Sequence, residues 1–425
     1  MKKIIASASL VAVGTAGLHA AYAPGLSRTE TSKPWTVSAA VRGFYDDNYY
    51  TAPKAEERDS WGMEISPSVG INLPMDQTLI SADYIFSAKW FEDRDKNEWD
   101  TYHQFNAALD HRFSERYDIE VTESFVYSDE PESVDSNLGS PIRTDSEAIR
   151  NTGGINFNAM MTERIALGLG YLNNYYNYDQ EGDGSRSALL DRIEHQIRLD
   201  GRYQVRENII GVLGTRFGYN DYTSDDLLID PAFIPPPLPA NLNKYDGDYQ
   251  DSYSYWFYGG ADTRFNSKLS GSFRIGIQYT DYDNANEDAT SPFIDNSLSY
   301  NYMPDSYVRF GVRHFRNATD VSVDPLNLDD PTLDQESTSL YGEVTHKITP
   351  RIMGNLIAQY QRSEFNDGTF DGDKDNYFLL GANVDYEINQ FLTAEVSYNL
   401  DRLDSDISNR SFTRNRILFG VRASY

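Results

Sequence analysis

The chain has 425 residues, no cysteine, 31 tyrosines and a formal net charge of −28 at pH 7. The lack of cysteine excludes disulfides and thiolate metal sites, and the acidic balance argues against nucleic acid, whose phosphates are bound by Lys and Arg. A mean hydropathy of −0.58 is typical of soluble proteins, but a membrane β-barrel also escapes that test because only alternate strand residues face lipid.

The N-terminus has the three parts of a secretory signal peptide. Lys2 and Lys3 are basic, residues 4–18 form an apolar run, and Ala21-Tyr22-Ala23 fits a cleavage site. We therefore expect residues 1–23 to be a signal peptide and residues 24–425 to be a single domain. No later stretch offers the ~18 apolar residues that a spanning helix needs.

From residue 35 onward, apolar and polar residues alternate, which predicts strands with one greasy and one polar face. The final segment shows this best, with Leu418 as its exception and apolar side chains at Ile417, Phe419, Val421, Ala423 and Tyr425. Segments 60–73, 191–203 and 268–279 have the same pattern.

The predicted strands are joined alternately by short turns and by longer loops rich in Asp, Glu, Asn and Ser, as in outer-membrane barrels. The longer loops include 129–147, 221–250, 318–336 and 366–375. The period-two rule predicts about eighteen strands. The predicted spans are 35–47, 60–73, 77–91, 99–113, 117–128, 148–161, 164–178, 188–203, 208–222, 251–265, 268–282, 294–303, 306–318, 337–348, 351–365, 376–388, 391–403 and 411–425.

The fold class that we predict is all-β: a transmembrane, antiparallel, up-and-down β-barrel. Sixteen strands is the alternative count, and an even number is expected because both termini of such barrels lie in the periplasm. A soluble propeller would place four short strands in each repeat, and a soluble sandwich would bury its apolar faces against each other.

The last strand resembles the C-terminal insertion signal of outer-membrane proteins, carried by Phe419, Val421 and Tyr425, although most such proteins end in Phe. With its long strands, Tyr-rich faces and acidic loops, the mature chain resembles the family called putative β-barrel porin 2. The resemblance implies the cell outer membrane of a Gram-negative bacterium and a porin role, and it carries over no substrate and no site. The expected partners are outer-membrane lipid, lipopolysaccharide, the barrel-assembly machinery and small hydrophilic solutes.

The polar parity of the strands should face the lumen and line a pore. The predicted pore-lining cations are Arg112, Arg198, Arg202, Arg216, Arg264, Arg274, Arg309, Arg313, Arg414, Arg416 and Arg422. The predicted pore-lining anions are Asp110, Glu194, Asp200, Asp262, Glu343, Asp385 and Glu395, together with Asp83. Opposed patches of the two signs would orient polar solutes. A salt-bridge lattice that stabilises the wall is the alternative, and the sequence leaves both open.

We predict a passive channel for small hydrophilic solutes or ions, with polysaccharide export or surface interaction as the alternative. A lipid-face hydrolase is less favoured, because no serine motif accompanies His195 or the other histidines of the mature chain, which are His103, His111, His314 and His346. No enzyme activity, cofactor or metal is therefore predicted.

Two loops allow further expectations. The Pro-rich stretch 233–239 could fold inward as a constriction or cap the outer mouth. Asp371-Gly372-Asp373-Lys374-Asp375 resembles the start of a calcium loop, but Asn376 and Ala382 stand where Gly and Glu are required. The acidic loops predict a preference for cations at the mouth.

Overall fold

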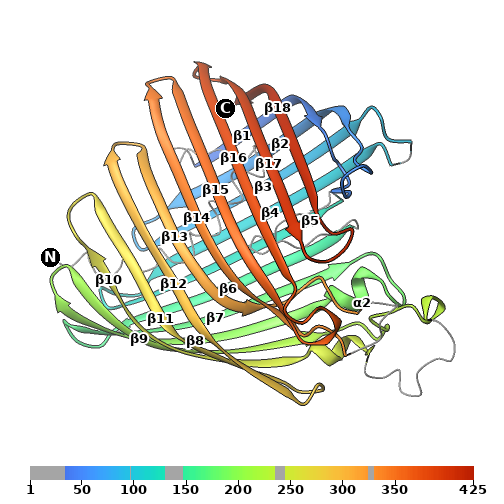
Figure 1. Ribbon diagram of the computed structural model, residues 1–425. Coiled ribbons are helices and arrows are strands. Elements are labelled where there is room, and N and C mark those ends of the chain that lie inside the picture. Colours follow the sequence, from blue (N-terminus) through green and yellow to red (C-terminus); the bar gives the residue numbers. More distant parts are fainter. Residues whose placement is uncertain (1–33, 96, 130–146, 235–244, 324–329) are drawn as a thin grey trace.

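The structure, a computed structural model, describes residues 34–95, 97–129, 147–234, 245–323 and 330–425, and eighteen antiparallel strands form one closed sheet in this part of the chain (Figure 1). The first nine strands are β1 (Trp35–Asp46), β2 (Ser60–Pro74), β3 (Thr78–Phe91), β4 (Trp99–Arg112), β5 (Tyr117–Ser128), β6 (Ala148–Met160), β7 (Ile165–Tyr178), β8 (Arg192–Arg206) and β9 (Ile209–Tyr222). The others are β10 (Ser252–Arg264), β11 (Leu269–Tyr282), β12 (Glu287–Met303), β13 (Ser306–Asn317), β14 (Asp334–Thr349), β15 (Ile352–Asn366), β16 (Lys374–Asn389), β17 (Leu392–Ser405) and β18 (Phe412–Ser424).

The barrel is closed by its first and last strands. β1 pairs with β18 from Ser38↔Ser424 to Asp46↔Arg416, and every other strand pairs with its neighbours in the chain. The predicted up-and-down barrel of eighteen strands is therefore confirmed, and the alternative of sixteen is wrong. Among the described residues, no helix is both long and apolar enough to cross a membrane.

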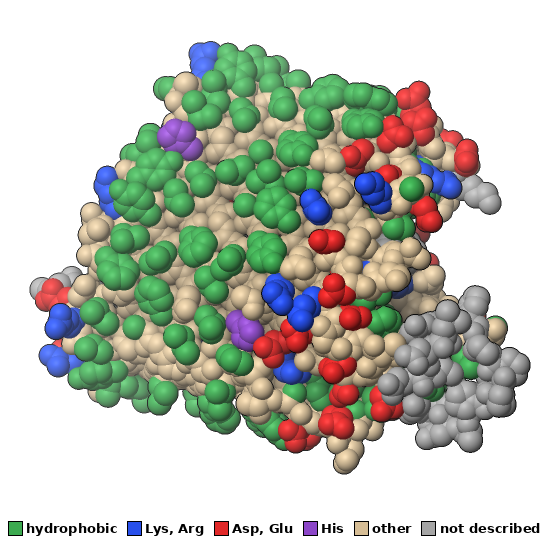
Figure 2. Space-filling model, viewed as in Figure 1, with side chains coloured by type: hydrophobic (Ala, Val, Ile, Leu, Met, Phe, Trp, Pro, Cys, Tyr) green, Lys and Arg blue, Asp and Glu red, His purple; other side chains and the backbone are tan. Residues whose placement is uncertain are grey.

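The alternation read from the sequence separates the two faces of the wall. On β2, Trp61, Met63 and Ile65 are each at least half exposed, whereas Glu64 and Ser66 between and beside them are buried. Figure 2 shows hydrophobic side chains spread over the outer surface of the strands, with Asp and Glu gathered toward the end that carries the long loops. The apolar band thus faces outward and the polar set faces the lumen.

Leu418, the exception in the last strand, belongs to a small apolar cluster on the inner side. It is buried with Phe44, Tyr49 and Phe91. The guanidinium of Arg94 lies 3.6 Å from the centre of the Phe91 ring and covers the cluster. The lumen of this barrel is therefore polar but contains local apolar packing that the alternation rule does not predict.

Two strand starts differ from the sequence prediction by four residues or more. β8 begins at Arg192 rather than residue 188, because the short helix α2 (Arg186–Leu190) precedes it, capped by Ser185, whose side chain accepts from the Ala188 amide. β12 begins at Glu287 rather than residue 294, because its polar first half pairs with β11 up to Tyr282↔Glu287. Further 3-10 turns are η2 (Pro231–Phe233), η4 (Gly247–Gln250) and η5 (Gly368–Phe370).

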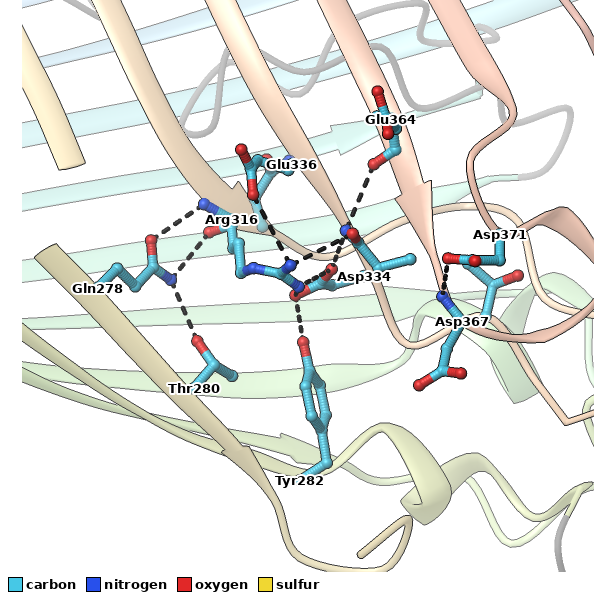
Figure 3. A network of polar contacts seen from close by, with 12 residues as sticks. Gln278, Thr280, Tyr282, Arg316, Asp334, Glu336, Glu364, Asp367 and Asp371 are labelled. Carbon is cyan, nitrogen blue, oxygen red and sulfur yellow. Dashed lines mark hydrogen bonds and ion pairs between the residues drawn. The ribbon is translucent and has the colours of Figure 1, made fainter. Parts of the chain in front are cut away.

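The wall separates between β12 and β13 near the loop end. Their pairing stops at Ile294↔His314, although β12 remains paired with β11 and β13 remains paired with β14 beyond that point. Side chains replace the missing ladder (Figure 3): Gln278 accepts from the Arg316 amide at 3.0 Å and donates to the Arg316 carbonyl at 3.3 Å. Tyr282 donates to Asp334, which also binds Arg316 at 2.8 Å. We name this group of contacts, which joins Gln278 and Tyr282 of β11 to Arg316 of β13 and Asp334 of β14, the seam.

Candidate functional site

The lumen charges nearest the closing strands form buried ion pairs. Arg42 on β1 is 2% exposed, and it donates to Glu64 on β2 at 3.1 Å and to Glu395 on β17 at 3.0 Å. Arg422 on β18 approaches the other oxygen of Glu395 at 3.0 Å. This network joins four consecutive strands of the closed sheet and so stabilises the wall where the barrel closes.

Most of the predicted lumen charges pair across strands in the same way. The pairs are Arg414–Asp46 at 2.6 Å, Arg416–Asp401 at 3.1 Å, Arg274–Asp262 at 2.9 Å, Arg309–Glu343 at 3.5 Å and Arg313–Asp295 at 3.7 Å. Within single strands, Asp385 accepts a hydrogen bond from Asn383 on β16 at 3.1 Å, and Glu194 pairs with Arg192 on β8 at 2.8 Å. For these residues the structure shows the contacts that a stabilising lattice requires.

Six charged partners in this lattice are absent from the sequence prediction: Arg42, Glu64, Asp46, Arg192, Asp401 and Asp295. The alternation of the strands indicates that such residues face the lumen, because Arg42 follows the apolar Val41 and Glu64 follows the apolar Met63 in alternating segments. Three predicted residues, Arg112, Asp110 and Arg264, instead lie exposed at the short-turn end of the wall.

A cavity of ≈ 610 Å³ lies within the lumen, on the side formed by β3 to β13. The predicted residues that line it are Asp83, Glu194, Arg198, Arg202, Arg216 and Arg313. Uncharged polar residues of β6 and β7, including Asn156, Asn158 and Gly170, lie between its acidic and basic parts. The cavity therefore presents both signs of charge along one wall.

Glycines on β7 let two of the arginines lie flat against the wall. Arg198 reaches across Gly170 to donate to the Asn156 side chain at 2.9 Å, and Arg202 reaches Asn158 at 3.3 Å. A Cβ at Gly170 would lie 2.9 Å from Asn156 Oδ1 and 3.4 Å from Arg198 Nε. A larger residue at this position would displace both side chains.

Asp200 is the carboxylate that these arginines share. Its Oδ2 lies 3.6 Å from both Arg198 and Arg202, and its Oδ1 accepts from the Tyr258 hydroxyl at 2.6 Å. One acidic group thus serves two guanidiniums and a phenol, so the basic stretch of the cavity keeps an excess of positive charge.

Arg216 differs from the other lumen arginines. Within the described part of the chain it has no carboxylate within ion-pair distance and no hydrogen-bond acceptor. Its guanidinium lies 5.5 Å from the Trp256 ring centre and 5.7 Å from that of Phe293, which are cation–π distances. A cation beside aromatic faces in a cavity is able to bind an anionic group of a solute.

The outer loops contact one another above the cavity. Arg410, in the β17–β18 loop, binds Asp320 of the β13–β14 loop at 2.6 Å and Asp375 of β16 at 2.9 Å. Gln250 donates to the Thr332 carbonyl at 2.8 Å and joins the β9–β10 loop to the β13–β14 loop. Residues 235–244, which include most of the Pro-rich stretch 233–239, lie outside the described residues, as does the predicted signal peptide.

One carboxyl of these loops has an altered titration. Burial raises the pKa of Asp251 to about 6, against the effect of the Tyr222 amide, which donates to it at 2.7 Å. In the described residues, no group of three or more Asp, Glu, His or Cys side chains is arranged to hold a metal ion.

Each described histidine has the hydroxyl of a Tyr or Thr as its partner, and not that of a serine. The contacts are Tyr84–His103, Thr78–His111, Tyr171–His195, His314–Thr338 and Tyr302–His346. His314 also lies 3.0 Å from Glu336.

The side chains predicted to form the insertion signal face outward, with Phe419, Val421 and Tyr425 at 50%, 43% and 63% exposure. Tyr425 lies beside Trp35 and Phe391, with ring centres 5.5 Å and 6.3 Å away. The last residue therefore belongs to an aromatic group at the short-turn end, where outer-membrane barrels carry an interfacial girdle.

Comparisons with known proteins give one family and several solved barrels, whereas no curated protein matches the chain. A BenF-like porin from Pseudomonas fluorescens Pf-5 has 11% identity and a TM-score of 0.46, covering 92% of this chain and 99% of that one. Acinetobacter baumannii OccAB3 has 12% identity and a TM-score of 0.43, with 92% and 99% covered. Pseudomonas aeruginosa OccK2 (OpdF), solved with glucuronate, has 12% identity and a TM-score of 0.45, with 92% and 98% covered. The model of the family described as putative beta-barrel porin 2 matches residues 240–425, and the family resemblance seen in the sequence is confirmed over that part of the chain.

Proposed function

We propose that the protein is a porin-like channel of the cell outer membrane through which small hydrophilic solutes or ions diffuse passively. The observation that carries this proposal is the closed barrel of eighteen strands, apolar outside and polar inside, with a charged cavity of ≈ 610 Å³ in its lumen. Barrels of this strand number leave room for an aqueous channel. The family match over residues 240–425 supports the porin role and the outer-membrane location.

The charges of the cavity favour polar over apolar solutes. Both signs are exposed to it, and a transverse field of this kind orients dipolar and charged molecules. The acidic outer loops add a preference for cations at the mouth, with a reach of about 8 Å at physiological salt. The protein has no catalytic role in this proposal.

The expected partners follow from the outer surface. The apolar band contacts outer-membrane lipid, the charged loop end lies at the level of lipopolysaccharide, and the strand that ends at Tyr425 is recognised by the barrel-assembly machinery. The outward side chains of the last strand, which are exposed on the surface of the barrel, support this recognition.

Conductance in planar bilayers tests the proposal. The purified protein is expected to give discrete ohmic steps, and bilayers that remain silent would contradict a channel. A lumen variant, Gly170→Phe, should reduce the step size because the added ring enters the cavity. Leu169→Phe, at the adjacent outward position that is 51% exposed, is the matched control and should leave the step unchanged.

A further inference from the structure

One row of paired residues crosses the lumen wall and contains two like-charged pairs. Asp110 on β4 is the direct partner of Glu120 on β5, and Arg198 on β8 is the direct partner of Arg216 on β9. All four belong to the inward parity of their strands. Like charges placed directly opposite each other destabilise a sheet, so neither pair is explained by the stability of the wall.

The two pairs lie in the same register and are separated by two uncharged residues. Glu120 pairs with Asn156, Asn156 pairs with Gly170, and Gly170 pairs with Arg198. Three strand spacings of about 4.8 Å therefore separate the backbones of Glu120 and Arg198. The Arg198 guanidinium shortens this gap, because it reaches Asn156 at 2.9 Å, next to Glu120.

The gap between the opposite charges is nevertheless not closed within the protein. Among the described residues, Asp110, Glu120 and Arg216 have no ion pair within 4.0 Å. Arg198 has Asp200 at 3.6 Å, but that carboxylate is shared with Arg202. Glu120, Arg198 and Arg216 line the same cavity. Glu120 and the two arginines thus face one cavity, and no ion pair joins Glu120 to either arginine.

We propose that this row is a subsite for zwitterionic solutes, namely α-amino acids and short peptides, and this proposal rests on the proposed channel function. The carboxylate of the solute binds Arg198 and Arg216, and its ammonium group binds Glu120. A monovalent anion satisfies the arginines but leaves the acidic pair uncompensated and is repelled by it. A monovalent cation has the opposite mismatch. Only a molecule that carries both charges a few ångströms apart neutralises both Glu120 and the two arginines.

Three probes of similar size but different charge test the subsite: alanine, propionate and isopropylammonium. Their binding to the detergent-purified full chain is measured by calorimetry or by ligand-observed NMR at neutral pH. Alanine is expected to bind at least ~10-fold more tightly than either singly charged probe, since one additional charge-assisted hydrogen bond corresponds to about that factor. Glu120→Gln should remove the advantage over propionate, and Arg216→Gln should remove the advantage over isopropylammonium. Glu207→Gln, in an exposed short turn, is the matched control and should change neither.

The outcomes separate this proposal from the channel itself. If propionate binds as tightly as alanine and Glu120→Gln has no effect, the row is an anion site and the zwitterion proposal is wrong. If no probe binds while the same preparation conducts KCl in bilayers, the subsite fails and the channel stands. If alanine binds selectively but the bilayers remain silent, the channel function fails alone. Heat-modifiable migration in SDS gels verifies that each variant is a folded barrel.

Discussion

Removing Arg42 from the barrel closure should destabilise the protein far more than removing an exposed cation with an ion pair of the same length. Arg42 lies 3.0 Å from Glu395, and its side chain and that of Glu395 are 1% and 4% exposed. Lys347 lies 3.0 Å from Asp305, but these side chains are 38% and 48% exposed. Loss of one partner from a buried pair costs about 3–5 kcal/mol, whereas an exposed pair contributes about 0–1 kcal/mol. Arg42→Met should therefore lower the free energy of unfolding several times more than Lys347→Met.

The surrounding contacts identify which carboxylate carries the penalty. Without Arg42, Glu395 still has Arg422 at 3.0 Å, but Glu64 retains only the hydroxyl of Ser87 among its described side-chain partners. Glu64→Gln added to Arg42→Met should therefore recover a large part of the lost stability. Urea unfolding in lipid vesicles, followed by tryptophan fluorescence, measures all three variants. Equal losses for Arg42→Met and Lys347→Met, or no recovery in the double variant, would refute the burial argument.

Three other changes have defined outcomes. Arg410→Gln should loosen the outer loops, because it leaves the buried carboxylates of Asp320 and Asp375 without their shared cation, and limited proteolysis should cleave the β13–β14 loop faster than in the parent. Asp251→Asn should flatten the pH dependence of stability: the folded pKa of about 6 exceeds the ordinary 3.8, so the parent's stability relative to the variant falls as pH rises from about 4 to about 6 and is constant above that window. Gln278→Leu should open the seam between β12 and β13, since it removes both contacts to the Arg316 backbone, and hydrogen exchange of the Arg316 amide should accelerate while that of β2 is unchanged.

The strands were predictable because one physical rule acts on every one of them. Each strand has lipid on one side and polar lumen on the other, so the period of two appears in the sequence, and the predicted span 117–128 equals β5. The rule weakens where the wall rises above the lipid. The first half of β12, which is largely polar, and the helix α2, which buries Leu189 and Leu190, lie at the loop end, and neither follows the alternation between lipid and lumen. The prediction was wrong at those two starts for this reason.

The partners of the lumen charges were less accessible from the sequence. Parity indicates that Arg422 and Glu395 face inward, but their network depends on Arg42, which is separated from Glu395 by 353 positions. That contact exists only because β1 pairs with β18 in one particular register, and an alternation pattern does not specify register between the two ends of a chain. The seam has the same origin, since it results from how the pairing of β12 and β13 ends rather than from the composition of either strand.

The distinction between paired and unpaired charges divides the lumen into two kinds of wall. Near the closing strands the charges are buried and complementary, so they account for stability and are poor candidates for solute binding. Along β4 to β9 the register instead brings together Asp110 with Glu120 and Arg198 with Arg216, an arrangement that costs stability in the absence of a ligand. Asp385 and Glu395 on β16 and β17 are also direct partners of like charge, but Arg42 and Arg422 compensate Glu395, whereas Glu120 has no such cation within 4.0 Å among the described residues. The row along β4 to β9 is therefore the part of the barrel where charge serves the solute rather than the fold, and there substitutions should change solute preference more than unfolding.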